Sequence, residues 1–436
     1  MAMINKQLTS LLCCLCLLTA TAQQRTLTIS EMFDLADQNN AAIQASRTAV
    51  QEAEQAVKVS KNGYMPSIKL SASASYIGNV WVADRDFQNG QTYESPHLGN
   101  NFGIDIEQVL YAGGTIMNNV KISELQAQLS QLNYQTQTQD VRNLLVDHYL
   151  NLYKCRNQLA VCDSNILLTQ QVIDDMRAKA EQGLALDNDI VRYELQKQNL
   201  IYLRTQLNGT IAILNNQLVV TLGLPANTDI QPDETLLTQD PVISNEDTWQ
   251  QSATNNSNAL KSADIGVQIN ERAEKLSKSG WIPKIGLVAC DHLDGPFTYD
   301  MPPIDKNVNV WYVGVGLTYD IDSWYKTTRD VKRSQLALQA AQDQRAVAQE
   351  QVAIAVQAAY IRYVEAFEQL RTQQKSVELA TDNYNVIADR YDNGLSLITD
   401  LIDASNAKLT AEIGLTNAQI DILANYYKLK YITNTL

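Results

Sequence analysis

The stretch SKNGYMPSIKLSASASYIG, residues 60–78, changes abruptly from one kind of predicted secondary structure to another. Gly63 and Pro66 are typical of a helix end, because glycine adopts the left-handed conformation that closes a helix and proline cannot continue one. In the residues that follow, serine or lysine occupies every second position and apolar side chains lie between them. This alternation predicts a strand with one apolar face and one polar face.

A close copy of this junction occurs in the second half of the chain. An offset of 217 residues aligns KVSKNGYMPSIKL (58–70) with KLSKSGWIPKIGL (275–287), and an offset of 211 aligns Gly183-Leu184 with Gly394-Leu395. Two such offsets indicate a tandem duplication. The change of offset falls between the two predicted strands of each half, where a loop tolerates a difference in length.

Each half has the same predicted order of elements: helix, strand, loop, strand, very long helix, turn and second helix. The first repeat, 23–222, has predicted helices at about 30–61, 113–181 and 187–222 and strands at about 66–80 and 101–111. The second repeat, 246–436, has predicted helices at about 246–279, 324–391 and 397–434 and strands at about 283–291 and 309–321. Glycine and prolines predict a linker over 223–245.

The long predicted helices carry a sustained apolar stripe. In the first repeat an apolar residue recurs every seven positions, at Leu145, Leu152, Leu159, Ile166 and Ile173. The second repeat has the same register at Val356, Tyr363, Leu370, Val377, Tyr384 and Tyr391. A seven-residue stripe indicates coiled-coil-like packing against neighbouring helices. These helices would be on the order of 100 Å long, and taken alone they also fit a coiled-coil rod.

The predicted strands argue against a simple rod. Each alternating run is about ten residues long, which is enough to cross a bilayer when the strand is tilted. Because lipid offers no partner to an open sheet edge, membrane strands must close into a barrel, and a barrel around water needs more than eight strands. One chain supplies four strands, so several copies must share one barrel. Three copies would give twelve strands and room for a lumen.

The N-terminus and the composition narrow the function further. Lys6, an apolar run over 11–18 and Ala20-Thr21-Ala22 predict a signal peptide over 1–22, so the mature chain is exported. A formal net charge of −14 argues against nucleic-acid binding. The three histidines are widely separated, and we find no nucleotide loop or nucleophile–base pair. We therefore expect no enzyme activity, no cofactor and no metal site. The cysteines of the mature chain, which we expect to be buried packing residues, are Cys155, Cys162 and Cys290.

Taken together, these features resemble the TolC family of outer-membrane efflux proteins over essentially all of the mature chain. The features are the duplication, the helix–Gly-x-x-Pro–strand junctions at 63–66 and 280–283, and the motifs QGLALDNDI and NGLSLITDLIDA. The resemblance implies a mixed α+β membrane protein: a homotrimeric outer-membrane β-barrel with four strands per chain, continued through the periplasm by a long α-helical barrel. It also implies a passive exit duct of a tripartite efflux system, which receives substrates from an inner-membrane pump through a periplasmic adaptor.

The same resemblance assigns roles to residues at the helix turns. Asp400 and Asp403 would line the periplasmic pore entrance, and their spacing of about one turn places them on one helix face. An acidic residue near a helix N-terminus is also explained by capping and the helix dipole, so that alternative stays open. Three copies would gather six carboxylates around one axis, which would disfavour anions.

Two further groups of residues follow from the family pattern. Asp189 and Tyr391 would form a latch between neighbouring helix pairs at the tip. The family uses an arginine two residues beyond the position of Gly394, and Ser396 stands there, so we expect the closed state to be held differently. The residues that would contact the adaptor are Gly183, Leu184, Gly394 and Leu395.

Two alternatives fit the same sequence. One is the outer-membrane duct of a type I protein secretion system, because the pump rather than the duct selects the cargo. The other is a periplasmic coiled-coil scaffold without a pore. A salt wash would extract the scaffold, whereas a barrel protein in outer-membrane lipid requires detergent.

Overall fold

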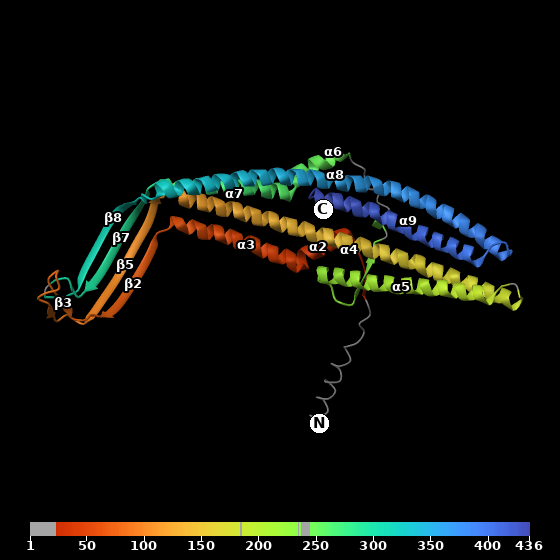
Figure 1. The fold of residues 1–436 in the computed structure, drawn as a ribbon, viewed down its shortest axis with the longest axis horizontal. Coiled ribbons are helices and arrows are strands. Elements are labelled where there is room, and N and C mark those ends of the chain that lie inside the picture. The colour runs from red at the N-terminus through yellow and green to blue at the C-terminus, as the bar shows by residue number, and fades with distance from the viewer. Residues whose placement is uncertain (1–22, 184, 234, 237–244, 301) are drawn as a thin grey trace, which may run out of the picture. The chain divides into compact units, whose positions relative to one another are not determined.

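The computed structural model describes residues 23–183, 185–233, 235–236, 245–300 and 302–436 (Figure 1). The predicted signal peptide lies outside the described residues. The chain forms two compact units, and each unit takes segments from both repeats. One unit comprises 48–132 and 261–347, and the other comprises the N-terminal segment up to Arg47 with 133–260 and 348–436. The duplication therefore does not divide the molecule into two separate domains.

The unit that contains 48–132 and 261–347 is built around a four-stranded antiparallel sheet. Its strands are β2 (Ser67–Tyr76), β5 (Leu98–Tyr111), β7 (Lys284–Gly295) and β8 (Val308–Thr318), in the order β2-β5-β7-β8 (Figure 1). The central β5–β7 pair joins the two repeats. A short hairpin, β3 (Val80–Val82) with β4 (Gln91–Tyr93), lies in the connection between β2 and β5.

The strand register collects the apolar side chains on one face of this sheet. One row across all four strands consists of Ile68, Ile106, Ala289 and Val313. This face is not covered: Leu70 is 76% exposed and Trp311 is 71% exposed. The opposite face is polar, and there His292 Nε2 lies 3.0 Å from Asp105 Oδ1. The alternation in the sequence thus corresponds to a two-faced sheet whose apolar side has no cover within the described chain.

The helices are long, and four of them contain residues of both units. The long helices are α3 (Ala41–Lys61), α4 (Thr115–Glu181), α5 (Asp187–Leu222), α7 (Asn258–Lys278), α8 (Ser323–Asp392) and α9 (Ile398–Ile432). The seven-residue stripe lies in the helix interfaces, since Leu145, Leu152 and Tyr363 are fully buried. None of the described helices combines the length and the apolarity that crossing a lipid bilayer requires.

Two helices that the sequence predicts as continuous are each interrupted. The first consists of α2 (Ile29–Asn39) and α3, and Asn40 between them accepts the N–H of Ala42 on its side-chain oxygen while its amide donates to Thr221 O. The second consists of α6 (Glu246–Asn256) and α7, separated by Ser257. Both breaks occur at positions related by the 217-residue offset. Each helix is interrupted because a polar side chain caps the start of a new helix. The pattern of apolar residues does not reveal such a cap.

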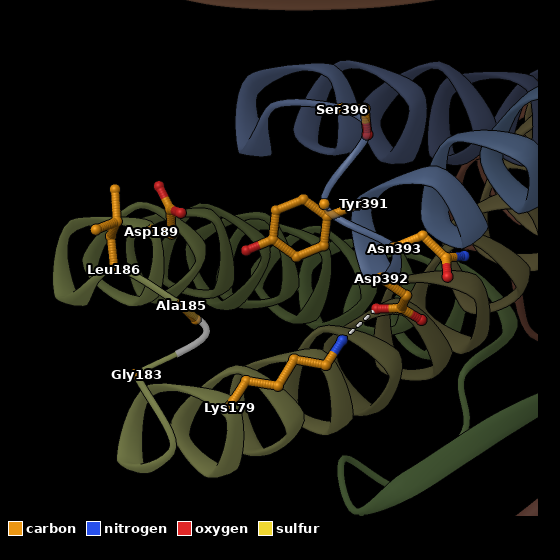
Figure 2. Close-up of a pocket in the computed structure, with 10 residues that line it drawn as sticks. Lys179, Gly183, Ala185, Leu186, Asp189, Tyr391, Asp392, Asn393 and Ser396 are labelled. Carbon is orange, nitrogen blue, oxygen red and sulfur yellow. Dashed lines mark hydrogen bonds and ion pairs between the residues drawn. The ribbon is translucent and has the colours of Figure 1, made fainter.

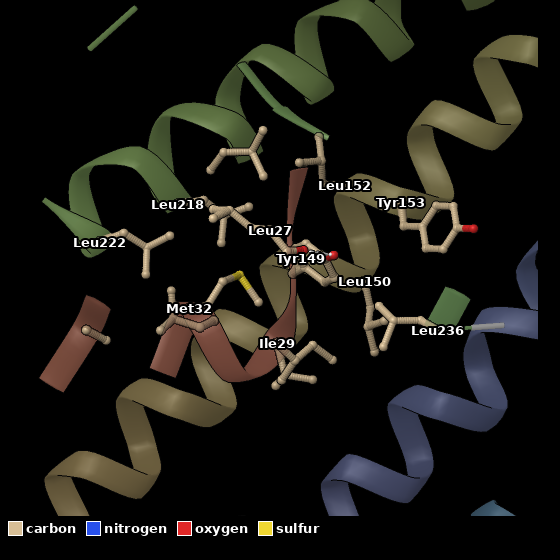
Figure 3. Close-up of a cluster of buried hydrophobic side chains, with 14 of the residues drawn as sticks. Leu27, Ile29, Met32, Tyr149, Leu150, Leu152, Tyr153, Leu218, Leu222 and Leu236 are labelled. Carbon is tan, nitrogen blue, oxygen red and sulfur yellow. Dashed lines mark hydrogen bonds between the residues drawn. The ribbon is translucent and has the colours of Figure 1, made fainter. Parts of the chain in front are cut away.

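The N-terminal segment and the predicted linker form a small sheet that the sequence does not predict. Strand β1 (Gln23–Leu27) pairs in parallel with β6 (Thr228–Pro232). The hydroxyl of Tyr149 donates to Leu27 O and accepts the N–H of Asp233 at 2.8 Å. Tyr149 lies in a buried apolar cluster with Leu27 and Met32 (Figure 3), and burial raises its pKa to about 12.

Candidate functional site at the helix turns

The turns between α4 and α5 and between α8 and α9 are closed by glycines in the left-handed conformation. Gly183 has φ +75° and Gly394 has φ +70°. At the second turn, Leu395 N–H donates to Arg390 O at 2.7 Å and Gly394 N–H donates to Tyr391 O at 2.9 Å, which completes a Schellman-type helix end. A Cβ atom on either glycine would meet nothing within 4 Å. The backbone conformation, and not lack of space, therefore selects glycine at both turns.

The helices that follow these turns begin with acidic residues. Asp187 and Asp189 lie in the first turn of α5. In α9, Asp400 Oδ2 accepts the N–H of Leu397 at 3.1 Å and so caps the helix. The side chains of Asp400 and Asp403 are nevertheless both exposed. Capping explains why an acidic residue at 400 favours this helix, and it leaves the carboxylate accessible to solvent.

A cleft of about 460 Å³ lies between the two turns and is lined by both hairpins (Figure 2). Lys179 in the last turn of α4 forms an ion pair with Asp392 at the end of α8, with Nζ 2.7 Å from Oδ1. The hydroxyl of Tyr391 points toward the side chain of Asp189 across the same cleft (Figure 2). Ser396 Oγ donates to the carbonyl of residue 387 at 3.3 Å. The cleft thus brings basic, acidic and phenolic groups of two hairpins together.

Apolar packing fixes the helices behind this polar cleft. The buried residues of this cluster come from all four helices and are Ile173, Met176, Tyr193, Tyr384, Ile398, Leu401 and Ala404. Burial, and to a smaller extent the charges of Asp189 and Asp392, raise the pKa of Tyr391. The Tyr391 phenol is therefore neutral at physiological pH and can donate a hydrogen bond to a carboxylate.

The structure brings together some of the residues that the sequence singles out. Asp189, Tyr391 and Ser396 line the cleft with both turn glycines, whereas Asp400 and Asp403 lie on α9 outside that lining. Leu395 is exposed, and Leu184 lies outside the described residues.

Sequence reasoning missed the Lys179–Asp392 ion pair. A lysine in the last turn of α4 gave a weak signal, because the helix dipole already explains a cation there. Within the described ranges, no group of three or more His, Cys, Asp or Glu side chains is arranged to hold a metal ion. The site is therefore one of ion pairs and exposed carboxylates.

A two-faced sheet joined to long paired helices is the architecture of outer-membrane channels, and the comparisons with known proteins agree. The family model described as outer membrane efflux protein matches residues 32–207 and 249–435, one segment in each repeat, so the chain belongs to this family. It is an outer-membrane protein with a periplasmic helical extension, from a family of channels rather than of enzymes.

Individual relatives are distant in sequence but similar over nearly the whole fold. The chain is 21% identical over 401 residues to the outer membrane efflux protein BepC of Brucella suis biovar 1 (strain 1330), covering 91% of this chain and 83% of BepC. The outer-membrane channel OprN has a TM-score of 0.76 and 14% identity, covering 94% of this chain and 90% of OprN. The open state of the Neisseria gonorrhoeae MtrE channel has a TM-score of 0.74 and 12% identity, covering 93% of this chain and 88% of the MtrE chain.

Proposed function

We propose that the chain is one subunit of a homotrimeric exit duct in the outer membrane. The duct passively conducts substrates that an inner-membrane pump delivers through a periplasmic adaptor. The observation that carries this proposal is the sheet with one uncovered apolar face and two outer edges, on β2 and β8, that pair with no other described strand. Lipid would leave those edges unsatisfied, so they must pair with neighbouring copies. Three chains would close a wall of twelve strands.

The helices support the same assembly. Exposed apolar residues recur at seven-residue spacing on α5, at Leu195 and Tyr202, and on α8, at Ile354 and Ile361. A stripe with this spacing is the surface that a coiled-coil partner covers. Because these side chains are exposed in the single chain, we expect neighbouring subunits to bury them.

The helix turns would form the periplasmic entrance. Three copies of the exposed pair Asp400 and Asp403 would place six carboxylates around the axis, which favours cations over anions. Contacts across the cleft, the Lys179–Asp392 pair and the approach of Tyr391 to Asp189, would hold the resting entrance narrow. The exposed turn residues, together with Leu184, would contact the adaptor. Tight binding of the adaptor would separate the hairpins.

Two measurements test this proposal. Native mass spectrometry of the detergent-solubilised mature chain should give the mass of a trimer, and planar bilayers should show ion-conducting channels. A stable monomer without conductance would refute the duct.

The entrance residues require their own variant. Asp400→Asn with Asp403→Asn removes two charges per chain, while asparagine keeps the ability to cap α9. We expect a weaker preference for cations over anions in the double variant. The control, Asp300→Asn with Asp305→Asn, removes the same charge from an exposed loop between β7 and β8. Equal selectivity in both variants would show that Asp400 and Asp403 do not line the entrance, and it would leave the proposal of a duct unaffected.

A further inference from the structure

The two helix-to-strand junctions share charged and aromatic residues that strand formation does not require. Lys58, Lys61 and Tyr64 in the first repeat correspond to Lys275, Lys278 and Trp281 in the second, and we call these six residues the junction collar. Segments 58–70 and 275–287 each contain three lysines and no acidic residue, although the chain has a net charge of −14. Positive charge is therefore concentrated at the two junctions against the overall bias of the sequence.

The structure places the collar where each helix meets the sheet. The lysines lie in the last turns of α3 and α7, and each helix continues into one 3-10 turn, Asn62–Tyr64 or Ser279–Trp281, that ends in the aromatic residue. Strands β2 and β7 begin three residues further on. All six collar side chains are exposed. Each junction thus presents two cations and an aromatic ring beside the start of a strand.

The first-repeat part of the collar adjoins the apolar face of the sheet. Gln108, which the register places in a row with Leu287 and Val315 of that face, donates its amide to Tyr64 O at 3.1 Å. An exposed indole, Trp324 at the start of α8, donates to the hydroxyl of Tyr319 at 2.7 Å. Aromatic residues with one polar end are typical of the boundary between lipid and water. This boundary therefore falls at the helical end of the sheet.

The helix dipole and nearby carboxylates account for only part of the lysine pattern. A cation in the last turn of a helix is stabilised by the helix dipole. Lys61 lies 3.6 Å from Glu124, and Lys278 lies 2.8 Å from Glu274. These effects act on any helix end, and they do not require an aromatic residue three positions after the second lysine in both repeats. They also leave Lys58 and Lys275 exposed to other ligands.

We propose that the junction collar binds anionic glycerophospholipids in the membrane leaflet nearer the helices. The lysine ammonium groups would contact the phosphate headgroup, and the acyl chains would lie on the apolar face next to it. Long lysine side chains reach an interface while their methylene groups cover apolar surface. The uncovered face selects a lipid over a free anion, because only a lipid fills both parts of the site. This inference rests on the outer-membrane position of the sheet.

A lipid titration of the mature chain tests the collar. Delipidated protein in detergent is titrated with phosphatidylglycerol or phosphatidylethanolamine, and bound lipid is counted by native mass spectrometry. Lys58→Gln with Lys275→Gln should weaken phosphatidylglycerol binding about fivefold for each lysine lost from a headgroup contact, with little change for phosphatidylethanolamine. The control, Lys375→Gln with Lys428→Gln, removes the same charge from exposed positions of α8 and α9 and should bind both lipids as the natural protein does.

Three outcomes would overturn the proposal: no preference for phosphatidylglycerol in the natural protein, equal losses in the two double variants, or displacement of phosphatidylglycerol by inorganic phosphate at similar concentration. A second variant, Tyr64→Leu with Trp281→Leu, keeps the charges and should weaken the binding of both lipids to the same extent. Subunit mass and conductance are measured on the same preparations. A chain that conducts as a trimer but shows no anionic preference would refute the collar alone, whereas a non-conducting monomer would refute the duct.

Discussion

Replacing Lys179 by methionine should widen the resting entrance of the duct. In the structure its ammonium group pairs with Asp392 and joins the end of α4 to the end of α8. Methionine keeps much of the length of the side chain and removes the charge. If this ion pair holds the two hairpins together in the resting state, its loss should increase the fraction of channels that conduct at the open level.

The exposure of the two side chains sets the size of the effect. Lys179 is 34% exposed and Asp392 is 63% exposed, so solvent screens the pair. Ion pairs in such positions stabilise a structure by about 0.5–1 kcal/mol. Three pairs in a trimer would contribute about 1.5–3 kcal/mol to a concerted closure. Because about 1.4 kcal/mol corresponds to a factor of ten, the ratio of open to closed channels should rise about 10- to 100-fold.

Single-channel recording in planar bilayers measures this ratio directly. The control is Lys375→Met, which removes a lysine whose partner, Glu378, lies on the same helix at 2.6 Å and joins no hairpins. Salt supplies a second test, since the Debye length falls from about 10 Å at 0.1 M to about 3 Å at 1 M. The difference between the natural channel and Lys179→Met should therefore shrink at high salt. Exchanging the charges, Lys179→Asp with Asp392→Lys, should restore closure.

Two results would refute this reasoning. One is an open fraction for Lys179→Met that equals that of Lys375→Met at low salt. The other is failure of the charge exchange to restore closure in a protein that still forms trimers. Either result would leave the apolar cluster behind the cleft, and not the ion pair, as the structure that holds the tips closed.

Two other changes test the fold around the site. Tyr149→Phe removes the hydroxyl that joins Leu27 to Asp233, so it should speed hydrogen exchange of the β1 and β6 amides and leave the slowly exchanging helix amides unaffected. Burial raises the pKa of Tyr149 to about 12, so the unfolded chain releases the phenol proton at a lower pH than the folded chain, and the natural chain should lose stability as pH rises from 10 to 12. This loss should be smaller in the variant. Gly394→Ala should lower the free energy of unfolding by about 1–2 kcal/mol through backbone strain alone, whereas Gly209→Ala, in mid-helix with equally open space, should raise it by about 1 kcal/mol, as thermal unfolding would show.

The architecture was predictable wherever a local pattern determined it. Alternation along β8 indicates a two-faced strand, and the seven-residue stripe through Leu145 and Leu152 indicates the helix interfaces. These signals need no knowledge of the partner segment, because the period alone selects the element and its buried face. The duplication also allowed each half to be interpreted from the other, which is why the order of elements could be inferred for both.

The features that sequence reasoning missed depend on partners distant in the chain. Strand β1 is five residues long, and its pairing with β6 is fixed by the Tyr149 hydroxyl more than 120 positions away. The break at Asn40 is stabilised by a bond to Thr221 O. The Lys179–Asp392 pair requires the ends of two different hairpins to meet, and a charge pattern on one helix cannot specify that. Contacts between segments distant in the chain were therefore what the sequence patterns could not predict.

In the proposed trimer, the duplication predicts a counterpart of the tip ion pair between subunits. The 211-residue offset that aligns the turn glycines also aligns Lys179 with Arg390 and Glu181 with Asp392, so both positions keep the sign of their charge. In a ring of three chains the two repeats alternate, and a contact from repeat one to repeat two within a chain recurs from repeat two to repeat one of the next chain. Glu181 and Arg390 are both exposed in the single chain, as this arrangement requires. We therefore expect Arg390→Glu to open the entrance as Lys179→Met does. The exchange Arg390→Glu with Glu181→Arg should close it again. An open fraction unchanged by Arg390→Glu would show that the hairpins of neighbouring chains do not meet through these residues.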